Sequence, residues 1–185
     1  MLVHARMKRV VLATALVAAS SGVASAGGYI GLGIGTGPNL STSDDARVES
    51  DGRSARLMLG YSFNRFSIEG AVGGYDMAMQ FDTSLYPVEV RQGSISGKYN
   101  LPLSDGFEAF GRIGLNKTWF SMEDSRFDAD GSGIILGAGM AYRIRGLSGA
   151  SIWLDYTYSR AALDGELTKT DLNAAMWTLG ATIGF

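Results

Sequence analysis

The chain has 185 residues, of which 16 are Lys or Arg, 18 are Asp or Glu and 26 are Gly, and it has no Cys. This length suits one domain, and the lack of Cys excludes disulfides, a lipid-modified cysteine and thiolate chemistry. The acidic balance argues against nucleic acid as a partner.

The first 26 residues have the three-part layout of a secretory signal peptide. Arg6, Lys8 and Arg9 precede an apolar run from Val10 to Ala19, and Ala24-Ser25-Ala26 forms a small-residue cleavage site. The apolar run is much shorter than the roughly 20 residues of a membrane-spanning helix. We expect a signal peptide over residues 1–26 and a mature domain over residues 27–185. Met7 is a second candidate start, because residues 7–26 alone form a complete signal.

Cleavage after Ala26 predicts a mature N-terminus at Gly27, because signal peptidase reads the small residues that precede the cut. N-terminal sequencing of the protein from isolated membranes checks this. A retained Val10–Ala19 segment would contradict the signal peptide.

The removed segment contains three basic residues and no acid, so the mature net charge becomes −5. It also contains His4, the only histidine.

The mature chain repeatedly alternates bulky apolar residues with small or charged ones, the period of a β-strand. Eight such stretches follow one another: 29–35, 56–63, 66–73, 94–101, 107–115, 134–143, 152–159 and 174–185. In the last one Trp177, Leu179 and Phe185 share one face. In a soluble sheet that face would point to a core, whereas in a membrane barrel it points to lipid. The signal peptide, and the charges that recur on the minor face, favour the barrel.

The connections alternate in length. Three are short, at 64–65, 102–106 and 145–149, and four are longer and polar, at 37–52, 76–89, 121–132 and 163–171. Short turns inside and longer loops outside are typical of outer-membrane barrels. We therefore predict an all-β fold, an eight-stranded antiparallel up-and-down transmembrane β-barrel, with a lumen just filled by side chains.

Seven charged residues lie on the minor face: Arg56, Glu69, Lys98, Glu108, Arg112, Arg143 and Asp155. An ionised group facing lipid costs about 2–4 kcal/mol at the midplane, so these charges should face the lumen. Counting from the short turns places Glu69, Lys98, Arg112 and Asp155 in one layer, with Lys98 beside Glu69 and Arg112 reaching towards Asp155. The seven charges could form a salt-bridge plug or line a narrow channel, and the sequence leaves both open.

The four long connections hold 14 acidic residues and three basic ones. These acids could be a solvated surface, could hold divalent cations that bridge to lipopolysaccharide, or could attract cations to a pore mouth. In the segment 127–133, Asp128 and Asp130 resemble the start of a calcium loop, and Asp124 lies nearby. The bidentate Glu needed at position twelve is replaced by Gly139. An Asp-Gly turn is therefore favoured, Asp124, Asp128 and Asp130 are weak metal candidates, and we expect no cofactor.

Five segments, GGYIGLGIG, LMLGYSF, EAFGRIGL, SIWLDYTYS and WTLGATIGF, are together similar to the OmpA-type eight-stranded outer-membrane barrels. The similarity spans the mature chain. It implies an outer-membrane location, contact with outer-membrane lipid and lipopolysaccharide, and insertion by the barrel-assembly machinery, which reads a last strand ending in Phe185. The family's periplasmic peptidoglycan-binding domain is not part of the similarity, so attachment to the cell wall is not implied.

An enzymatic role is not expected. Barrel enzymes of the outer membrane resemble one another in using histidine as general base, and residues 27–185 contain none. We expect a non-enzymatic structural or surface-interaction protein, as a monomer. The alternative is a small passive pore. An adhesin is a weaker alternative, because loops of this length offer little area against the roughly 800 Å² per partner of a standard interface.

Overall fold

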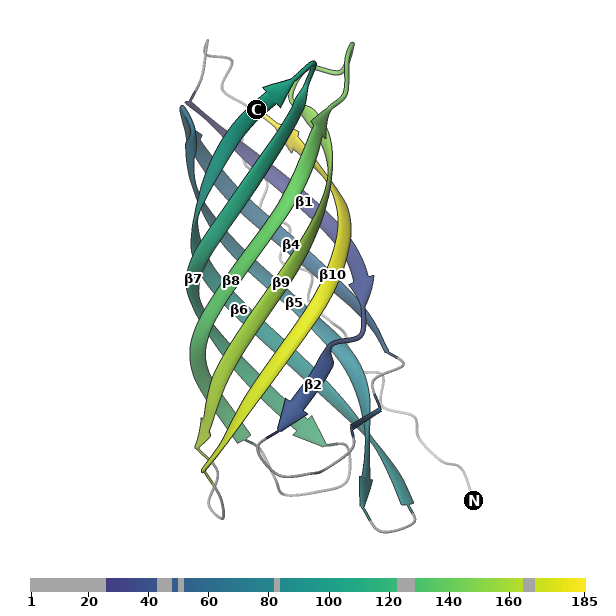
Figure 1. Ribbon diagram of the computed structural model, residues 1–185. Coiled ribbons are helices and arrows are strands. Elements are labelled where there is room, and N and C mark those ends of the chain that lie inside the picture. The colour runs from purple at the N-terminus through teal and green to yellow at the C-terminus, as the bar shows by residue number, and fades with distance from the viewer. Residues whose placement is uncertain (1–25, 43–47, 50–51, 82–83, 123–128, 165–168) are drawn as a thin grey trace, which may run out of the picture.

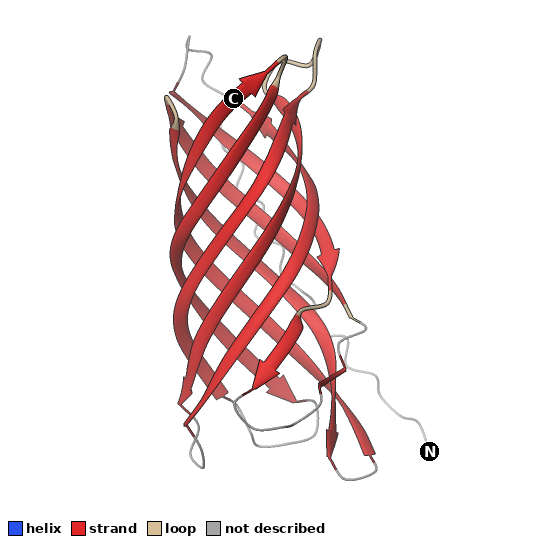
Figure 2. Ribbon diagram, in the orientation of Figure 1, coloured by secondary structure: helices blue, strands red, loops and turns tan. Residues whose placement is uncertain are grey.

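The computed structural model describes residues 26–42, 48–49, 52–81, 84–122, 129–164 and 169–185. Its strands are β1 (Ala26–Thr36), β2 (Asn39–Thr42), β3 (Val48–Glu49), β4 (Arg53–Phe63), β5 (Phe66–Phe81), β6 (Ser84–Ser104), β7 (Phe107–Met122), β8 (Ala129–Arg143), β9 (Ala150–Asp164) and β10 (Lys169–Gly184). The long strands wind around one axis (Figure 1), and strands make up all the regular structure drawn in Figure 2. Within the described ranges, no helix is both long and apolar enough to cross a membrane.

The eight long strands close into a barrel. From β4 to β10 each long strand pairs antiparallel with the next along the chain, and β1 pairs with both β4 and β10. The closing register places Tyr29 opposite Gly184 and Gly35 opposite Thr178. Closure satisfies the backbone groups of both end strands, which a lipid environment requires. The predicted eight-stranded antiparallel up-and-down barrel is confirmed.

The three short connections gather at one end of the barrel, the upper end in Figure 1, which we call the short-turn end. Asp105 and Gly106 both have positive φ, 48° and 91°. A two-residue hairpin turn with this backbone matches the right-handed twist of the two strands that it joins. Asn64 has a φ of 60°, which Asn tolerates better than most residues.

The four longer connections were predicted too long. β5 and β6 continue through most of 76–89, β8 begins at Ala129 and β10 begins at Lys169. Within 37–52, β2 pairs with β10 and β3 pairs with β5. The sequence criterion was an alternation of apolar and polar residues. Over 76–81 the apolar residues Met77, Met79 and Phe81 lie at the other parity from Phe66, Ile68 and Val72, although the backbone pairing of β5 with β6 continues there.

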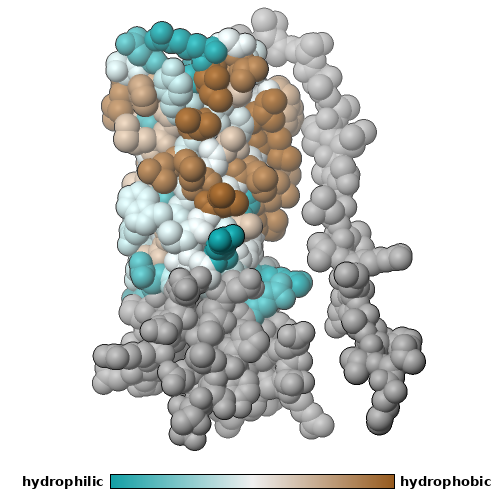
Figure 3. Space-filling model, turned by 90° about the vertical axis from the view of Figure 1, so that its right-hand side faces the viewer, coloured by the Kyte–Doolittle hydropathy of each residue, from teal (hydrophilic) through white to brown (hydrophobic). Residues whose placement is uncertain are grey.

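The apolar side chains of the barrel point outwards. Leu32, Ile34, Ile113 and Leu115 are each more than 60% exposed, whereas Ser67, Thr118 and Thr178 are buried inside. Figure 3 shows apolar residues over much of the visible barrel wall, below a hydrophilic rim. Aromatic rings pair on the outer surface, with centroid distances of 5.0 Å for Phe66–Tyr99 and 5.0 Å for Tyr156–Trp177. An apolar outer surface is the arrangement that a lipid environment requires.

Candidate functional site: the charged lumen

Asp155 on β9 is the centre of the lumen's charged residues. Its side chain is fully buried and accepts hydrogen bonds from Arg56 Nη2 on β4, at 2.9 Å, and from Arg112 Nη2 on β7. Arg112 also donates to Thr157 Oγ1, two residues further along β9. Strand alternation aims these side chains inwards, so residues from different sides of the barrel meet around one carboxylate.

Glu69 on β5 continues the network on the other side of Arg112. Arg112 Nη1 lies 3.7 Å from Glu69 Oε2. Glu69 Oε1 accepts hydrogen bonds at 2.5 Å from Lys98 Nζ on β6 and from the Tyr29 hydroxyl on β1. These contacts therefore join six side chains into one connected layer: Tyr29, Arg56, Glu69, Lys98, Arg112 and Asp155. We call this set the charged layer.

Aromatic rings flank the cations of this layer. The Arg56 guanidinium lies 4.9 Å from the centroid of the Trp153 ring. Lys98 Nζ lies 4.9 Å from the ring centroid of Tyr29 and 5.2 Å from that of Phe110. Such contacts help to stabilise cations away from water. Tyr29 and Trp153 were not singled out in the sequence, although each has the parity of an inward-facing position.

Glycine on neighbouring strands makes room for these rings. A Cβ at Gly60 would lie 2.2 Å from the Tyr29 ring, and a Cβ at Gly180 would lie 2.3 Å from the Trp153 ring. Distances this short are not found between real side chains. The small residues of the minor face are therefore explained by the large side chains that the lumen holds.

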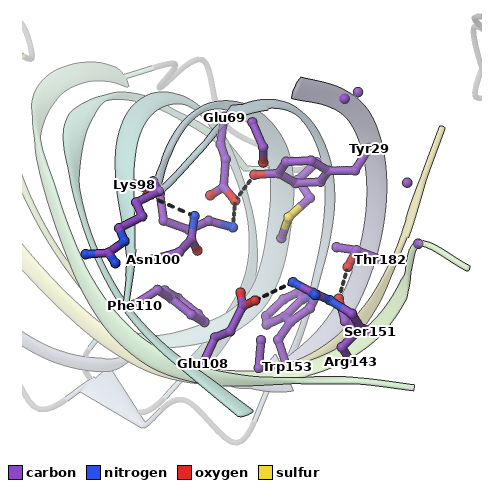
Figure 4. A pocket seen from close by; sticks show the side chains of 18 of the residues that line it. Tyr29, Glu69, Lys98, Asn100, Glu108, Phe110, Arg143, Ser151, Trp153 and Thr182 are labelled. Atoms are coloured by element: carbon purple, nitrogen blue, oxygen red, sulfur yellow. Dashed lines mark hydrogen bonds and ion pairs between the residues drawn. The ribbon is translucent and has the colours of Figure 1, made fainter. Parts of the chain in front are cut away.

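The other two predicted charges, Glu108 and Arg143, lie towards the short-turn end. Arg143 Nη2 is 2.5 Å from Glu108 Oε1, and the two side chains are 67% and 25% exposed, respectively. They line a cavity of about 790 Å³, whose wall also contains turn residues such as Arg65 and Gly149. Figure 4 shows this pair beside Trp153, and the Lys98–Glu69–Tyr29 contacts across the cavity from it.

A second, smaller cavity lies beyond the charged layer. Its volume is only about 30 Å³, and it is lined partly by Ser54, Tyr75, Gln92 and Thr178. Arg56 lines both this cavity and the large one. Gln92 Nε2 contacts Thr118 Oγ1 at 3.5 Å across neighbouring strands. The charged layer thus lies between a large cavity and a small one.

The weak metal candidates are not brought together in the described structure. Asp124 and Asp128 lie outside the described residues. Asp130 is exposed on β8, and its carboxylate forms an ion pair with Lys117 Nζ at 2.9 Å. The described residues contain no group of three or more His, Cys, Asp or Glu side chains placed to hold a metal ion.

Phe185 lies directly after β10 at the short-turn end. Its backbone N–H donates to the Gly28 carbonyl at 2.9 Å, and Phe185 is half exposed on the outer surface.

Deleting Phe185 is expected to lower the amount of folded barrel in the outer membrane, because the similarity to OmpA-type barrels implies that this residue is part of the assembly signal. Immunoblots of outer-membrane and periplasmic fractions measure this. Phe185→Tyr, which keeps a ring, is the control, and wild-type levels after the deletion would refute the role.

Several solved structures similar to this barrel are outer-membrane proteins. Neisserial surface protein A is 16% identical with a TM-score of 0.67, covering 88% of this chain and 100% of its own. The outer membrane protein OprG from Pseudomonas aeruginosa is 16% identical, with a TM-score of 0.60 and coverages of 87% and 97%. Ail, the attachment invasion locus protein of Yersinia pestis, is 19% identical, with a TM-score of 0.57 and coverages of 88% and 100%.

No curated protein sequence matches the chain. At the low identities of the solved structures, their likeness shows the fold alone. The family follows from a second comparison, in which the model of the outer membrane protein beta-barrel domain matches residues 10–185, nearly the whole chain. With its closed barrel and apolar outer surface, the chain belongs to the outer membrane protein beta-barrel domain family and is located in the outer membrane.

Proposed function

We propose that the protein is a non-enzymatic structural or surface-interaction protein of the outer membrane whose lumen is closed by the charged layer. The observation that carries this proposal is the fully buried Asp155 carboxylate, held by two arginines from different strands. Three cationic and two anionic side chains of the layer are joined through shared partners. A buried charge is tolerated when it is paired and hydrogen-bonded, so this connected network of ion pairs favours a plug.

The two lumen cavities also support a plug. The space of about 790 Å³ at the short-turn end meets one of about 30 Å³ across the charged layer. An eight-stranded barrel has an interior that side chains can just fill, and long arginine and lysine side chains fill it efficiently. A hydrated ion would have to displace paired charges in order to pass this layer.

The proposed orientation places the short-turn end in the periplasm and the longer connections outside the cell, as in barrels of this class. The excess of acids in those connections suits divalent cations that bridge to lipopolysaccharide. Residues 1–26 act as the signal peptide in this proposal. The barrel-assembly machinery inserts the chain, which then acts as a monomer.

Single-channel conductance of the purified, refolded mature barrel tests the plug. Wild type is expected to conduct little or not at all. Glu69→Ala is expected to leak, because it removes the shared acceptor of Lys98 and Tyr29. Glu108→Ala, which opens only the exposed pair at the mouth, is the matched control and should stay closed. A steady conductance in wild type that Glu69→Ala leaves unaltered would refute the plug.

A small passive pore is the second candidate. The large cavity at the short-turn end favours it, because that cavity already gives solutes access to one side of the charged layer. The conductance experiment separates the two candidates directly. The adhesin alternative has less support: Ail has been solved with the heparin analogue sucrose octasulfate, but the 14 acids against three bases in the connections here would repel such a polyanion.

A further inference from the structure

A groove of about 680 Å³ crosses the outer surface of β6, β7 and β8. Its floor consists of the small, outward-facing residues Gly97, Gly111 and Ala138, each on a different strand. Gly111 lies opposite Tyr99 on one side and opposite Ala138 on the other. Larger side chains form the walls: Phe66, Tyr99, Ile113, Leu136 and Tyr156. We call this depression the Gly97 groove.

The protein's own packing does not account for the glycines of this floor. A Cβ at Gly97 would meet no atom within 4 Å, and one at Gly111 would meet only the Gly137 carbonyl oxygen, at 3.9 Å. By contrast, Gly60 and Gly180 leave room for lumen rings. Glycine within a strand weakens it and often marks a place where another molecule approaches closely. The open space at Gly97 and Gly111 faces outwards, so the molecule it accommodates lies outside the barrel wall.

The surroundings of the groove indicate what fills it. The groove is continuous with the apolar surface that a barrel of this family presents to lipid, so hydrocarbon surrounds it. A two-fold dimer centred there would place the same concave surface against itself and leave a void. A single acyl chain is flexible and narrow enough to follow a groove between side chains. The shape therefore favours a lipid chain over a second copy of the protein.

A cationic residue is next in the chain to a wall residue of the groove. Arg65 directly precedes Phe66 and is exposed at the short-turn end, where it also lines the mouth of the large lumen cavity. Its guanidinium forms no ion pair with another described residue, and Asn100 contacts only its backbone carbonyl. Lys98 and Arg112 are among the residues that line the groove, and no acidic residue is. An exposed arginine beside an apolar groove complements a phosphate group joined to an acyl chain.

We propose that the Gly97 groove binds one phospholipid of the periplasmic leaflet. One acyl chain lies over Gly97, Gly111 and Ala138, and the phosphate lies on Arg65. The choice of leaflet, and so of phospholipid rather than lipopolysaccharide, rests on the proposed orientation with the short turns in the periplasm. It does not depend on whether the lumen conducts.

The test fills the groove with a side chain. Mature barrel is purified from outer membranes in mild detergent, and native mass spectrometry measures the fraction that carries one phospholipid. Gly111→Leu should fold, because a Cβ there meets only an ordinary contact, and it should lower that fraction about tenfold or more. Gly70→Leu is the matched control: Gly70 is also outward-facing with nothing within 4 Å, but it does not line the groove, so lipid retention should stay at the wild-type level.

Arg65→Gln tests the phosphate contact separately. This variant at an exposed turn should retain less phosphatidylglycerol than wild type after reconstitution in phosphatidylcholine–phosphatidylglycerol nanodiscs, and it keeps the proposal testable if Gly111→Leu does not fold. Three results would overturn the proposal. The first is that wild type carries no phospholipid, and the second is that a folded Gly111→Leu or Arg65→Gln variant retains as much phospholipid as wild type. The third is a dimer that Gly111→Leu abolishes. Retention of lipopolysaccharide in place of phospholipid would reject the leaflet, whatever the lumen conducts.

Discussion

Replacing Asp155 with alanine is expected to lower the free energy of unfolding of the barrel by about 3–5 kcal/mol, the usual loss when one partner of a buried charge pair is removed. Arg112 and Arg56 would then face each other without the carboxylate that both contact. Both lie largely inside the barrel, with side chains 4% and 14% exposed, so water could solvate them only by entering the charged layer.

Denaturant unfolding of the refolded barrel in lipid vesicles, followed by tryptophan fluorescence, measures this loss. Asp155→Asn should recover part of the stability, because the amide oxygen can still accept a hydrogen bond, but it supplies no negative charge. Glu108→Ala is the matched control, since its partner Arg143 is 67% exposed and an exposed pair contributes only about 0–1 kcal/mol. An Asp155→Ala barrel as stable as the Glu108→Ala barrel would show that the layer is hydrated.

Placing an arginine at Leu154 is expected to destabilise the barrel by about 2–4 kcal/mol, the depth-dependent loss for a cation on the lipid face near the midplane. Leu154 is next to Asp155 on β9 but points to the opposite side of the wall. It is 46% exposed and lies between Met140 and Leu179, which are also exposed. The chain therefore carries a buried charge and an exposed leucine at adjacent positions.

Leu103→Arg is the control for depth. Leu103 is 52% exposed on β6, next to the Asp105–Gly106 turn, where the guanidinium can reach water. The loss there should be about 0–1 kcal/mol. The same unfolding measurement compares the two variants, which differ in position but not in the residue introduced. Equal losses would mean that Leu154 does not face the hydrocarbon region.

The sequence by itself determined the face on which each side chain lies. A strand has a side-chain period of two, so alternation in a stretch such as 152–159 separates outward Leu154 from inward Asp155 without knowledge of the strand's neighbours. The short turns identify antiparallel neighbours, which is why the eight-stranded barrel was predictable. Strand ends were not predictable, because along 76–81 the apolar residues shift to the other parity while β5 stays paired with β6.

Depth along the strands predicted that Lys98 meets Glu69 and that Arg112 reaches Asp155, and only the tertiary structure decided the other contacts of these charges. The pairing of Glu69 with Lys98 joins neighbouring strands and could be expected from their similar depth. The approach of Arg56 to Asp155 depends on barrel curvature and shear, which bring together strands far apart in the chain. Tyr29 and Trp153 likewise become partners of the charges only when the sheet closes. The Gly97 groove depends on the register of β6, β7 and β8, since a local sequence cannot show that a glycine on one strand adjoins small residues on two others.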